Sequence, residues 1–385
     1  MKLYKSPDKS GNKSDRIFMI LFLIIFAMCF LPFLLKKENA NNETAPVNVE
    51  VNDVSGPDMP EIITGVQEKP GIRLHYSEKD LPEITDETIS SSAALLYDRK
   101  TNTVIYSKNA DSPLFPASTT KIMTACVALR YLKPDYPLKV GTELSLLQPE
   151  SSLAYLNQGN ELTLEDALYA LLLPSGNDAA YVIAVNTARF VSENPAMPDA
   201  EAVKYFGNLM NDEAFEAGAD HTHFCVPDGY HDPFHYTTAE DMLKIAIHSE
   251  KYPLIAQICA QPYRETQIIS GQSFYWANGN LLVTNDNGYY LPFATGLKTG
   301  FTDEAGYCMV ATAADENNDL IAVVMKAPTL AGRYTDAARL FYSVMNPEKL
   351  KEPPFVTTEP ATEPPSEEKA EGEENPENES EDADE

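Results

Sequence analysis

The stretch Pro116-Ala117-Ser118-Thr119-Thr120-Lys121 opens a helical pattern that continues to Arg130, with a proline ahead of the first turn. Ser118 and Lys121 are three residues apart, so their hydroxyl and amine share one face of the predicted helix. A serine is a weak nucleophile until a base takes its proton, and lysine is such a base only where its surroundings favour the neutral amine. The stretch therefore indicates a nucleophilic serine. The alternative is a helix cap beside a surface lysine.

A second polar motif, Ser175-Gly176-Asn177, lies between two predicted helices and follows Pro174, which ends the first of them. A serine hydroxyl on such a turn can relay a proton. An asparagine amide can hold a peptide group because it donates and accepts together. An ordinary turn between helices favours the same residue types, so this motif alone decides nothing.

A third motif, Lys298-Thr299-Gly300, leads into two apolar, β-branched runs at 307–313 and 320–326. An ammonium and a hydroxyl beside each other on a strand suit a terminal carboxylate, and the glycine lets a substrate backbone approach closely. A turn with a solvated lysine is the alternative. Because all three motifs occur in their required helix, turn or strand context, we interpret them together as one active site.

Strand patterns lie at both ends of the domain, and helix patterns lie between them. Residues 93–106 and 307–326 read as two hairpins. Capping boxes at Thr163 and Thr238 start two of the predicted helices, and 333–345 reads as a closing helix. This order predicts an α+β fold, in which an antiparallel sheet is built from both ends of the domain with a helical insertion.

The motifs stand in longer blocks at 116–125, 173–180, 235–239 and 296–307. On these blocks the chain resembles the low-molecular-weight D-alanyl-D-alanine carboxypeptidases, which are penicillin-binding serine peptidases. The resemblance implies a β-lactamase/transpeptidase-like fold over 86–348. It implies a hydrolase that removes the terminal D-alanine from peptidoglycan stem peptides through an acyl-enzyme, with β-lactam antibiotics as covalent inhibitors and no cofactor.

The resemblance also implies a role for each motif residue. Ser118 would be the acylated nucleophile, Lys121 its general base, and Ser175 the group that passes the proton to the leaving D-alanine. Some relatives carry an arginine ahead of Lys-Thr-Gly, but residues 278–282 contain no basic side chain. Backbone N–H groups of Ser118 and Phe301 would form the oxyanion hole. The implied substrate-binding residues are Asn177, Lys298, Thr299, Gly300 and Phe301.

Other functions of the same fold stay open at this point. A DD-endopeptidase or transpeptidase would use a cross-linked peptide or another amine in place of the simple substrate. A β-lactamase is disfavoured because the sequence shows no clear second carboxylate motif for fast deacylation. A non-catalytic penicillin-binding wall protein would keep the binding residues without the reaction.

The charge of the chain argues against nucleic acid as a partner. The 385 residues carry a formal net charge of −29, of which −13 lies in residues 352–385. Nucleic acid is bound by clusters of Lys and Arg, and the sequence has no basic patch. A metal site is not expected either, because His221, His223, His231 and His235 fit no rigid ligand spacing.

Residues 17–35 are apolar throughout and would form a helix about 28 Å long, enough to span a bilayer. Most flanking basic residues precede them, which predicts a cytoplasmic tail at 1–16 and an extracytoplasmic catalytic domain held at the cell membrane. A cleaved signal peptide, giving a secreted protein, is the alternative. A spacer is predicted over 36–85 and a disordered acidic tail over 349–385.

Overall fold

The computed structural model describes residues 74–77, 81, 84–285, 287–351 and 354–355. The predicted membrane-spanning segment 17–35 and the predicted cytoplasmic tail 1–16 lie outside these residues. Among the residues that are described, no helix has both the length and the apolar character needed to cross a bilayer.

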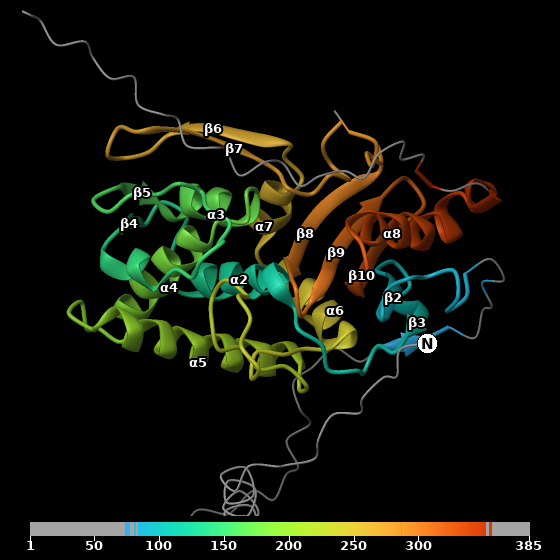
Figure 1. The fold of residues 1–385 in the computed structure, drawn as a ribbon, viewed down its shortest axis with the longest axis horizontal. Coiled ribbons are helices and arrows are strands. Elements are labelled where there is room, and N and C mark those ends of the chain that lie inside the picture. The colour runs from blue at the N-terminus through green and yellow to red at the C-terminus, as the bar shows by residue number, and fades with distance from the viewer. Residues whose placement is uncertain (1–73, 78–80, 82–83, 286, 352–353, 356–385) are drawn as a thin grey trace, which may run out of the picture. The chain divides into compact units, whose positions relative to one another are not determined.

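The main sheet has six strands in the order β1-β3-β2-β10-β9-β8 (Figure 1). Neighbouring strands are antiparallel, except that β1 runs parallel to β3. Because β10 pairs with β2, strands from the two ends of the domain lie side by side, which confirms the predicted sheet. The strands are β1 (His75–Tyr76), β2 (Ala93–Asp98), β3 (Thr103–Lys108), β8 (Ala294–Thr302), β9 (Gly306–Ala314) and β10 (Asp319–Ala327).

A helical insertion connects β3 to β8, and it extends past the β8 edge while also packing on one face of the sheet (Figure 1). It also contains two small two-stranded sheets, β4 with β5 and β6 with β7. Its helices are η1 (Ala117–Thr120), α2 (Lys121–Tyr131), η2 (Thr142–Leu146), α3 (Leu164–Leu172), α4 (Asn177–Val191), α5 (Asp199–Ala217), α6 (Ala239–His248), η3 (Ser249–Lys251) and α7 (Pro253–Cys259). Its strands are β4 (Pro137–Lys139), β5 (Glu161–Thr163), β6 (Tyr263–Gln267) and β7 (Ser273–Ala277). After β10 come α8 (Leu330–Met345) and η4 (Pro347–Lys351).

Successive residues of β2 point to opposite faces of the sheet, and each face has its own core. Leu95 joins the cluster that includes Ile122 of α2, whereas Leu96 joins the cluster that includes Phe341 of α8. All four side chains are fully buried. Each such burial stabilises the fold by roughly 2 kcal/mol, so the sheet is held rigidly between two helical layers.

Local sequence patterns correctly predicted several of these helices and strands. Both predicted hairpins and the closing helix are confirmed. Thr163 and Thr238 accept hydrogen bonds from the backbone nitrogens of Asp166 and Asp241, at 3.0 and 3.1 Å, and so cap α3 and α6 as expected. The helix predicted from Ser118 begins instead with the 3-10 turn η1.

The predicted boundaries of the spacer and of the acidic tail need correction. His75 and Tyr76 pair with β3, and Ile84 is buried in the core beneath α8, so the spacer does not extend to residue 85. At the other end, the Phe355 ring packs at 5.1 Å against the Tyr289 ring, beyond the expected boundary at 349. A few apolar residues in a polar segment can join a surface that other segments have built. The rest of the predicted tail, 356–385, lies outside the described residues.

Candidate active site

The amine of Lys121, at the start of α2, is fully buried and makes three hydrogen bonds. Its Nζ lies 2.8 Å from the hydroxyl of Ser118, 2.7 Å from Oδ1 of Asn177 and 2.8 Å from the main-chain oxygen of Asp228. Three segments that are far apart in the sequence therefore meet at one amine. The structure brings together the first two predicted motifs.

These three contacts fit a lysine that works as a base. The Asn177 and Asp228 atoms are carbonyl oxygens, which only accept hydrogen bonds. A neutral amine has two protons and one lone pair, so with both protons given to the carbonyls its lone pair faces Ser118. Burial lowers the pKa of Lys121 to about 8, although the nearby charges of Asp228 and Asp178 raise it. Lys121 can therefore take the proton of Ser118 near neutral pH.

Ser118 stands on a turn that is fixed locally. Ala117 has a φ of +48°, and both the backbone nitrogen and the hydroxyl of Thr119 donate to the oxygen of Pro116. The next hydroxyl, of Thr120, lies 2.8 Å from Nε2 of His235. Burial lowers the pKa of His235 to about 3, which keeps that ring neutral. His235 thus has a structural role, because its ring bonds Thr120 and the backbone nitrogen of Cys225.

Ser175 and Asn177 come from the tight connection between α3 and α4. Ser175 has a φ of +65°, and its buried Oγ has no hydrogen-bond partner within the described residues. The Asn177 amide nitrogen donates to Ser151 at 3.1 Å, which fixes the amide oxygen toward Lys121. A Cβ on Gly176 would lie 2.8 Å from the oxygen of Ala170, so only glycine fits this turn.

Lys298, Thr299 and Gly300 lie on the edge strand β8, on a strand as predicted rather than a turn. The Lys298 amine is buried and donates to the Thr299 oxygen at 3.0 Å. Burial first, and then the charge of Lys121, hold the pKa of Lys298 well below its usual range, so the two amines act on each other. Phe301 is more than a third exposed, and its ring packs on Tyr307.

Arg333 of α8 supports this strand, although the sequence patterns gave it no role. Its guanidinium is buried and donates to the oxygen of Gly300 at 3.2 Å. It also lies over the rings of Tyr307 and Tyr334. An arginine in a closing helix carries no local sign of this contact, because the contact depends on how α8 packs against the sheet.

Several cysteines and histidines of the domain contribute to packing. Among the described residues, Cys126, Cys259 and Cys308 are buried and form no disulfide. His223 bonds Phe234, and His235 accepts from the backbone nitrogen of Cys225 at 3.0 Å. Among the described residues, no three His, Cys, Asp or Glu side chains are grouped so that they could hold a metal ion.

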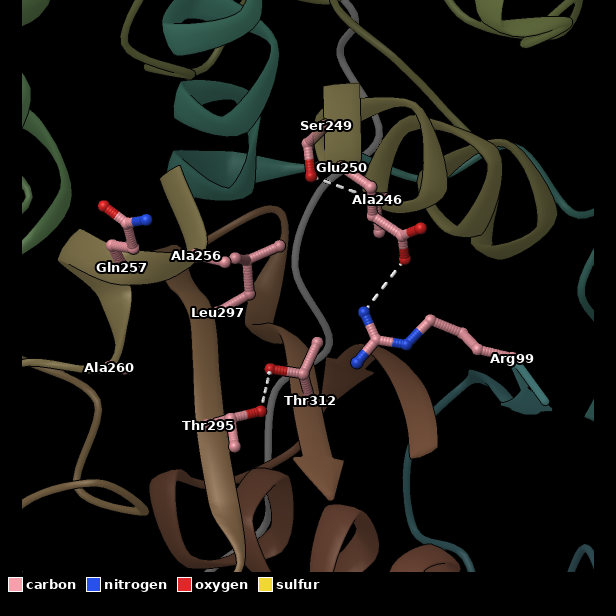
Figure 2. A pocket seen from close by; sticks show the side chains of 10 residues that line it. All are labelled: Arg99, Ala246, Ser249, Glu250, Ala256, Gln257, Ala260, Thr295, Leu297 and Thr312. Atoms are coloured by element: carbon pink, nitrogen blue, oxygen red, sulfur yellow. Dashed lines mark hydrogen bonds and ion pairs between the residues drawn. The ribbon is translucent and has the colours of Figure 1, made fainter. Parts of the chain in front are cut away.

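A cavity of about 300 Å³ lies elsewhere, where η3 and α7 face β8 and β9 (Figure 2). Arg99 and Glu250 form an ion pair at 2.9 Å in its wall, and Thr295 donates to Thr312 at 2.9 Å. No predicted site residue lines it, although Leu297 precedes Lys298. The cavity is lined by Arg99, Ala246, Ser249, Glu250, Ala256, Gln257, Ala260, Thr295, Leu297 and Thr312.

Known proteins that this chain resembles are D-alanyl-D-alanine peptidases. A family model described as D-alanyl-D-alanine carboxypeptidase matches residues 80–329. The D-alanyl-D-alanine carboxypeptidase DacF of Bacillus subtilis is 31% identical over 268 residues, which is 69% of this chain and 64% of that protein. A D-alanyl-D-alanine carboxypeptidase of a Streptomyces strain is 31% identical over 67% of this chain and 88% of its own length. A D-alanyl-D-alanine endopeptidase of Escherichia coli is 33% identical over 66% of this chain and 76% of its own length.

Solved structures that resemble this chain are also DD-peptidases or penicillin-binding proteins. The crystal structure of a Streptomyces DD-transpeptidase has a TM-score of 0.60 and 30% identity, and the match covers 68% of this chain and 98% of that one. An ampicillin-bound penicillin-binding protein of Listeria monocytogenes has a TM-score of 0.53 and 25% identity, over 66% of this chain and 97% of that one. The β-lactamase/transpeptidase-like fold that the family resemblance implied is confirmed.

Proposed function

The chain belongs to the D-alanyl-D-alanine carboxypeptidase family of serine peptidases, and we propose that it removes the terminal D-alanine from peptidoglycan stem peptides through an acyl-enzyme on Ser118. The observation that carries this proposal is the Lys121 amine, whose two carbonyl partners leave its lone pair toward the Ser118 hydroxyl at 2.8 Å. That arrangement activates an otherwise weak nucleophile.

Acylation begins when the Ser118 O–H bond breaks and an N–H bond forms on Lys121. The Ser118 oxygen attacks the carbonyl carbon of the penultimate D-alanine, and the carbonyl electron pair moves to its oxygen. Collapse of this adduct breaks the peptide C–N bond, and the leaving amine of D-alanine takes the proton. Water then hydrolyses the ester, which restores Ser118 and releases the shortened peptide.

Ser175 relays the proton to the leaving amine in this scheme. Its support is a buried hydroxyl that has no hydrogen-bond partner in the described part of the chain, on a strained turn directly before Asn177. An unpartnered buried hydroxyl is costly, and in an enzyme it is available to substrate. Asn177 orients the substrate peptide group beside Lys121.

Strand β8 holds the other side of the substrate. Thr299 binds the terminal carboxylate, and Lys298 shapes the electrostatic field around Ser175. Gly300 permits the close approach of the backbone, and the N–H groups of Ser118 and Phe301 stabilise the oxyanion. This role for the backbone is supported by the close approach of β8 to the Ser118 turn, since a Cβ on Gly300 would lie 2.7 Å from the Ser118 nitrogen.

The location proposed for the enzyme is the outer side of the cell membrane, where its peptidoglycan substrate occurs. Residues 17–35 would anchor it, and the domain would extend from about residue 74 to 355 with the acidic tail beyond. β-Lactams would acylate Ser118 in place of the stem peptide, by analogy with the ampicillin-bound Listeria relative.

Mass spectrometry of the intact, full-length protein after incubation with benzylpenicillin tests the nucleophile. We expect the mass of one penicilloyl group on the wild-type protein and none on a Ser118→Ala variant. Equal labelling of the two proteins would remove Ser118 from its role.

A DD-endopeptidase or DD-transpeptidase activity is the second candidate. It is favoured by the similarity of this chain to the E. coli endopeptidase and the Streptomyces transpeptidase. Their sequence identities of 33% and 30% are close to the 31% of the two carboxypeptidases. Product analysis on isolated peptidoglycan separates the reactions. Free D-alanine with unchanged cross-links indicates the carboxypeptidase, whereas a change in cross-linking indicates the second candidate.

A further inference from the structure

The Asp228 side chain is a buried acid next to the proposed base. It is 1% exposed, and its main-chain oxygen accepts a hydrogen bond from Lys121 at 2.8 Å. One carboxyl oxygen, Oδ1, accepts from the backbone nitrogen of Tyr230 at 3.1 Å, and the other, Oδ2, is buried without a partner within the described residues. A buried carboxylate that lacks full hydrogen bonding calls for another compensating interaction.

The segment that carries Asp228 is locked against the turn of Ser118. Gly229 has a φ of +82°, and a Cβ there would lie 1.9 Å from the oxygen of Ala117 and 2.8 Å from the hydroxyl of Thr120. On the preceding side, Thr124 of α2 donates to the oxygen of Pro227. The carboxyl group is therefore held in a fixed position relative to Ser118 and Lys121.

Several charged or titratable groups surround Lys121, and they differ in how well they are satisfied. Asp178 of α4 accepts from three backbone nitrogens, those of Ala154, Leu156 and Ala179, which compensate its charge. The pKa of Lys298 of β8 is lowered by burial and then by the charge of Lys121. Burial, and then the charge of Asp228, raise the pKa of Tyr181 of α4, so that phenol stays neutral. Of these two carboxylates, Asp228 has fewer hydrogen-bond partners than Asp178 within the described residues.

Burial raises the pKa of Asp228, and the charge of Lys121 is the largest influence that lowers it. The same attraction raises the pKa of Lys121 against its own burial. The two groups therefore stabilise each other's charged forms, and this matters at the step in which Lys121 becomes an ammonium inside the protein.

We propose that Asp228 is a positioning residue, whose carboxylate compensates the positive charge that Lys121 gains on taking the proton of Ser118. This inference rests on the proposed function. In the step, the Ser118 O–H bond breaks, an N–H bond forms on Lys121, and the positive charge appears beside a negative charge that is already in place. Because Asp228 acts through Lys121, it needs no contact with substrate.

The test is the pH dependence of acylation by benzylpenicillin in the full-length wild-type protein and an Asp228→Asn variant, from pH 5.5 to 9.5. The amide keeps the shape and the acceptor for Tyr230 but removes the charge. We expect the rising limb of the rate to move to lower pH by about one unit, because loss of an adjacent anion lowers a lysine pKa. The plateau rate should fall about tenfold or more, because the ammonium is less stabilised.

An Asp232→Asn variant is the matched control, since Asp232 belongs to the same loop and hydrogen-bonds Phe234 rather than the active site. In this control, the acylation rate should rise over the same pH range as in the wild type. The proposal would be overturned if the acylation rate of Asp228→Asn rose at the same pH as that of the wild type, or at a higher pH. Wild-type protein that is not acylated at any pH would instead reject the proposed function.

A second measurement covers the case in which Asp228→Asn fails to fold. Carboxyl ¹³C NMR of the wild-type protein should show Asp228 ionised through the pH range in which acylation accelerates. A carboxyl group that stays protonated across that range would refute the compensating role, whatever the behaviour of the variant.

Discussion

The backbone of Gly300 packs against the backbone nitrogen of Ser118 so closely that a Cβ on Gly300 would lie 2.7 Å from it. The same atom would lie 3.0 Å from the nitrogen of Thr119. Real Cβ atoms do not approach backbone this closely, so glycine is the residue that lets β8 and η1 meet. The third motif is joined to the first through this contact.

A Gly300→Ala variant should therefore lose activity more than stability. The added methyl group must separate β8 from the Ser118 turn, and misplacement of a reacting group by about 1 Å can cost on the order of 100-fold in rate. We expect acylation by benzylpenicillin to slow by roughly that factor. Gly288→Ala is the control, because a Cβ there meets no atom within 4 Å. Similar rates for the two variants would contradict the contact.

Acylation of the wild-type protein should accelerate with rising pH and level off above about pH 8. Burial lowers the pKa of Lys121 to about 8, and only the neutral amine, whose fraction grows as pH rises through that value, can accept the proton. Rapid-mixing kinetics with benzylpenicillin at a series of pH values provides the profile. A rate that is constant from pH 6 to 9, or that still rises steeply at pH 10, would exclude Lys121 as this base.

Replacement of Ser175 by alanine should leave the protein as stable as before while slowing the reaction. The Ser175 hydroxyl makes no hydrogen bond to any residue that the structure describes, so the free energy of unfolding should change by less than about 0.5 kcal/mol. Loss of a proton relay typically costs about 100-fold or more. Thermal unfolding and D-alanine release should be measured on the same samples. Unfolding at a clearly lower temperature would show that the hydroxyl is structural.

Asp336 ties the two ends of the domain together. Its carboxylate accepts hydrogen bonds from the backbone and hydroxyl groups of Ser90 and Ser91, next to β2. An Asp336→Ala variant leaves these donors without a partner, and we expect it to lose on the order of 3 kcal/mol of stability. Urea unfolding should reveal this loss, with the exposed Glu87→Ala as control. Equal urea midpoints for the two variants would show that the hydrogen bonds of Asp336 contribute nothing to stability.

The sequence located those parts of the fold that local chemistry determines. The caps at Thr163 and Thr238 and the apolar runs of the two hairpins are local signals, and the structure has them where they were expected. The helix α5 was missed, although Ala202, Phe206 and Met210 recur at intervals of four along its buried face. That spacing was a readable signal of an amphipathic helix.

The contacts within the site depended on tertiary structure and could not be predicted in the same way. Pro227-Asp228-Gly229 has the composition of a turn, but nothing nearby in the sequence indicates that this turn packs on Ala117 and faces Lys121. Arg333 likewise reaches Gly300 only because α8 packs on the sheet. The sequence motifs therefore predicted the reacting groups, whereas the residues that support these groups could be identified only from the tertiary structure.

The central claim is that Ser118, with Lys121 as its base, releases the terminal D-alanine. The most direct measurement is free D-alanine formed from diacetyl-Lys-D-Ala-D-Ala by the full-length protein and by its Ser118→Ala variant. We predict steady release by the wild type, about one D-alanine for each shortened peptide, and no release above background by the variant. Release at the same rate by both proteins, or by neither while penicillin still labels Ser118, would contradict the claim.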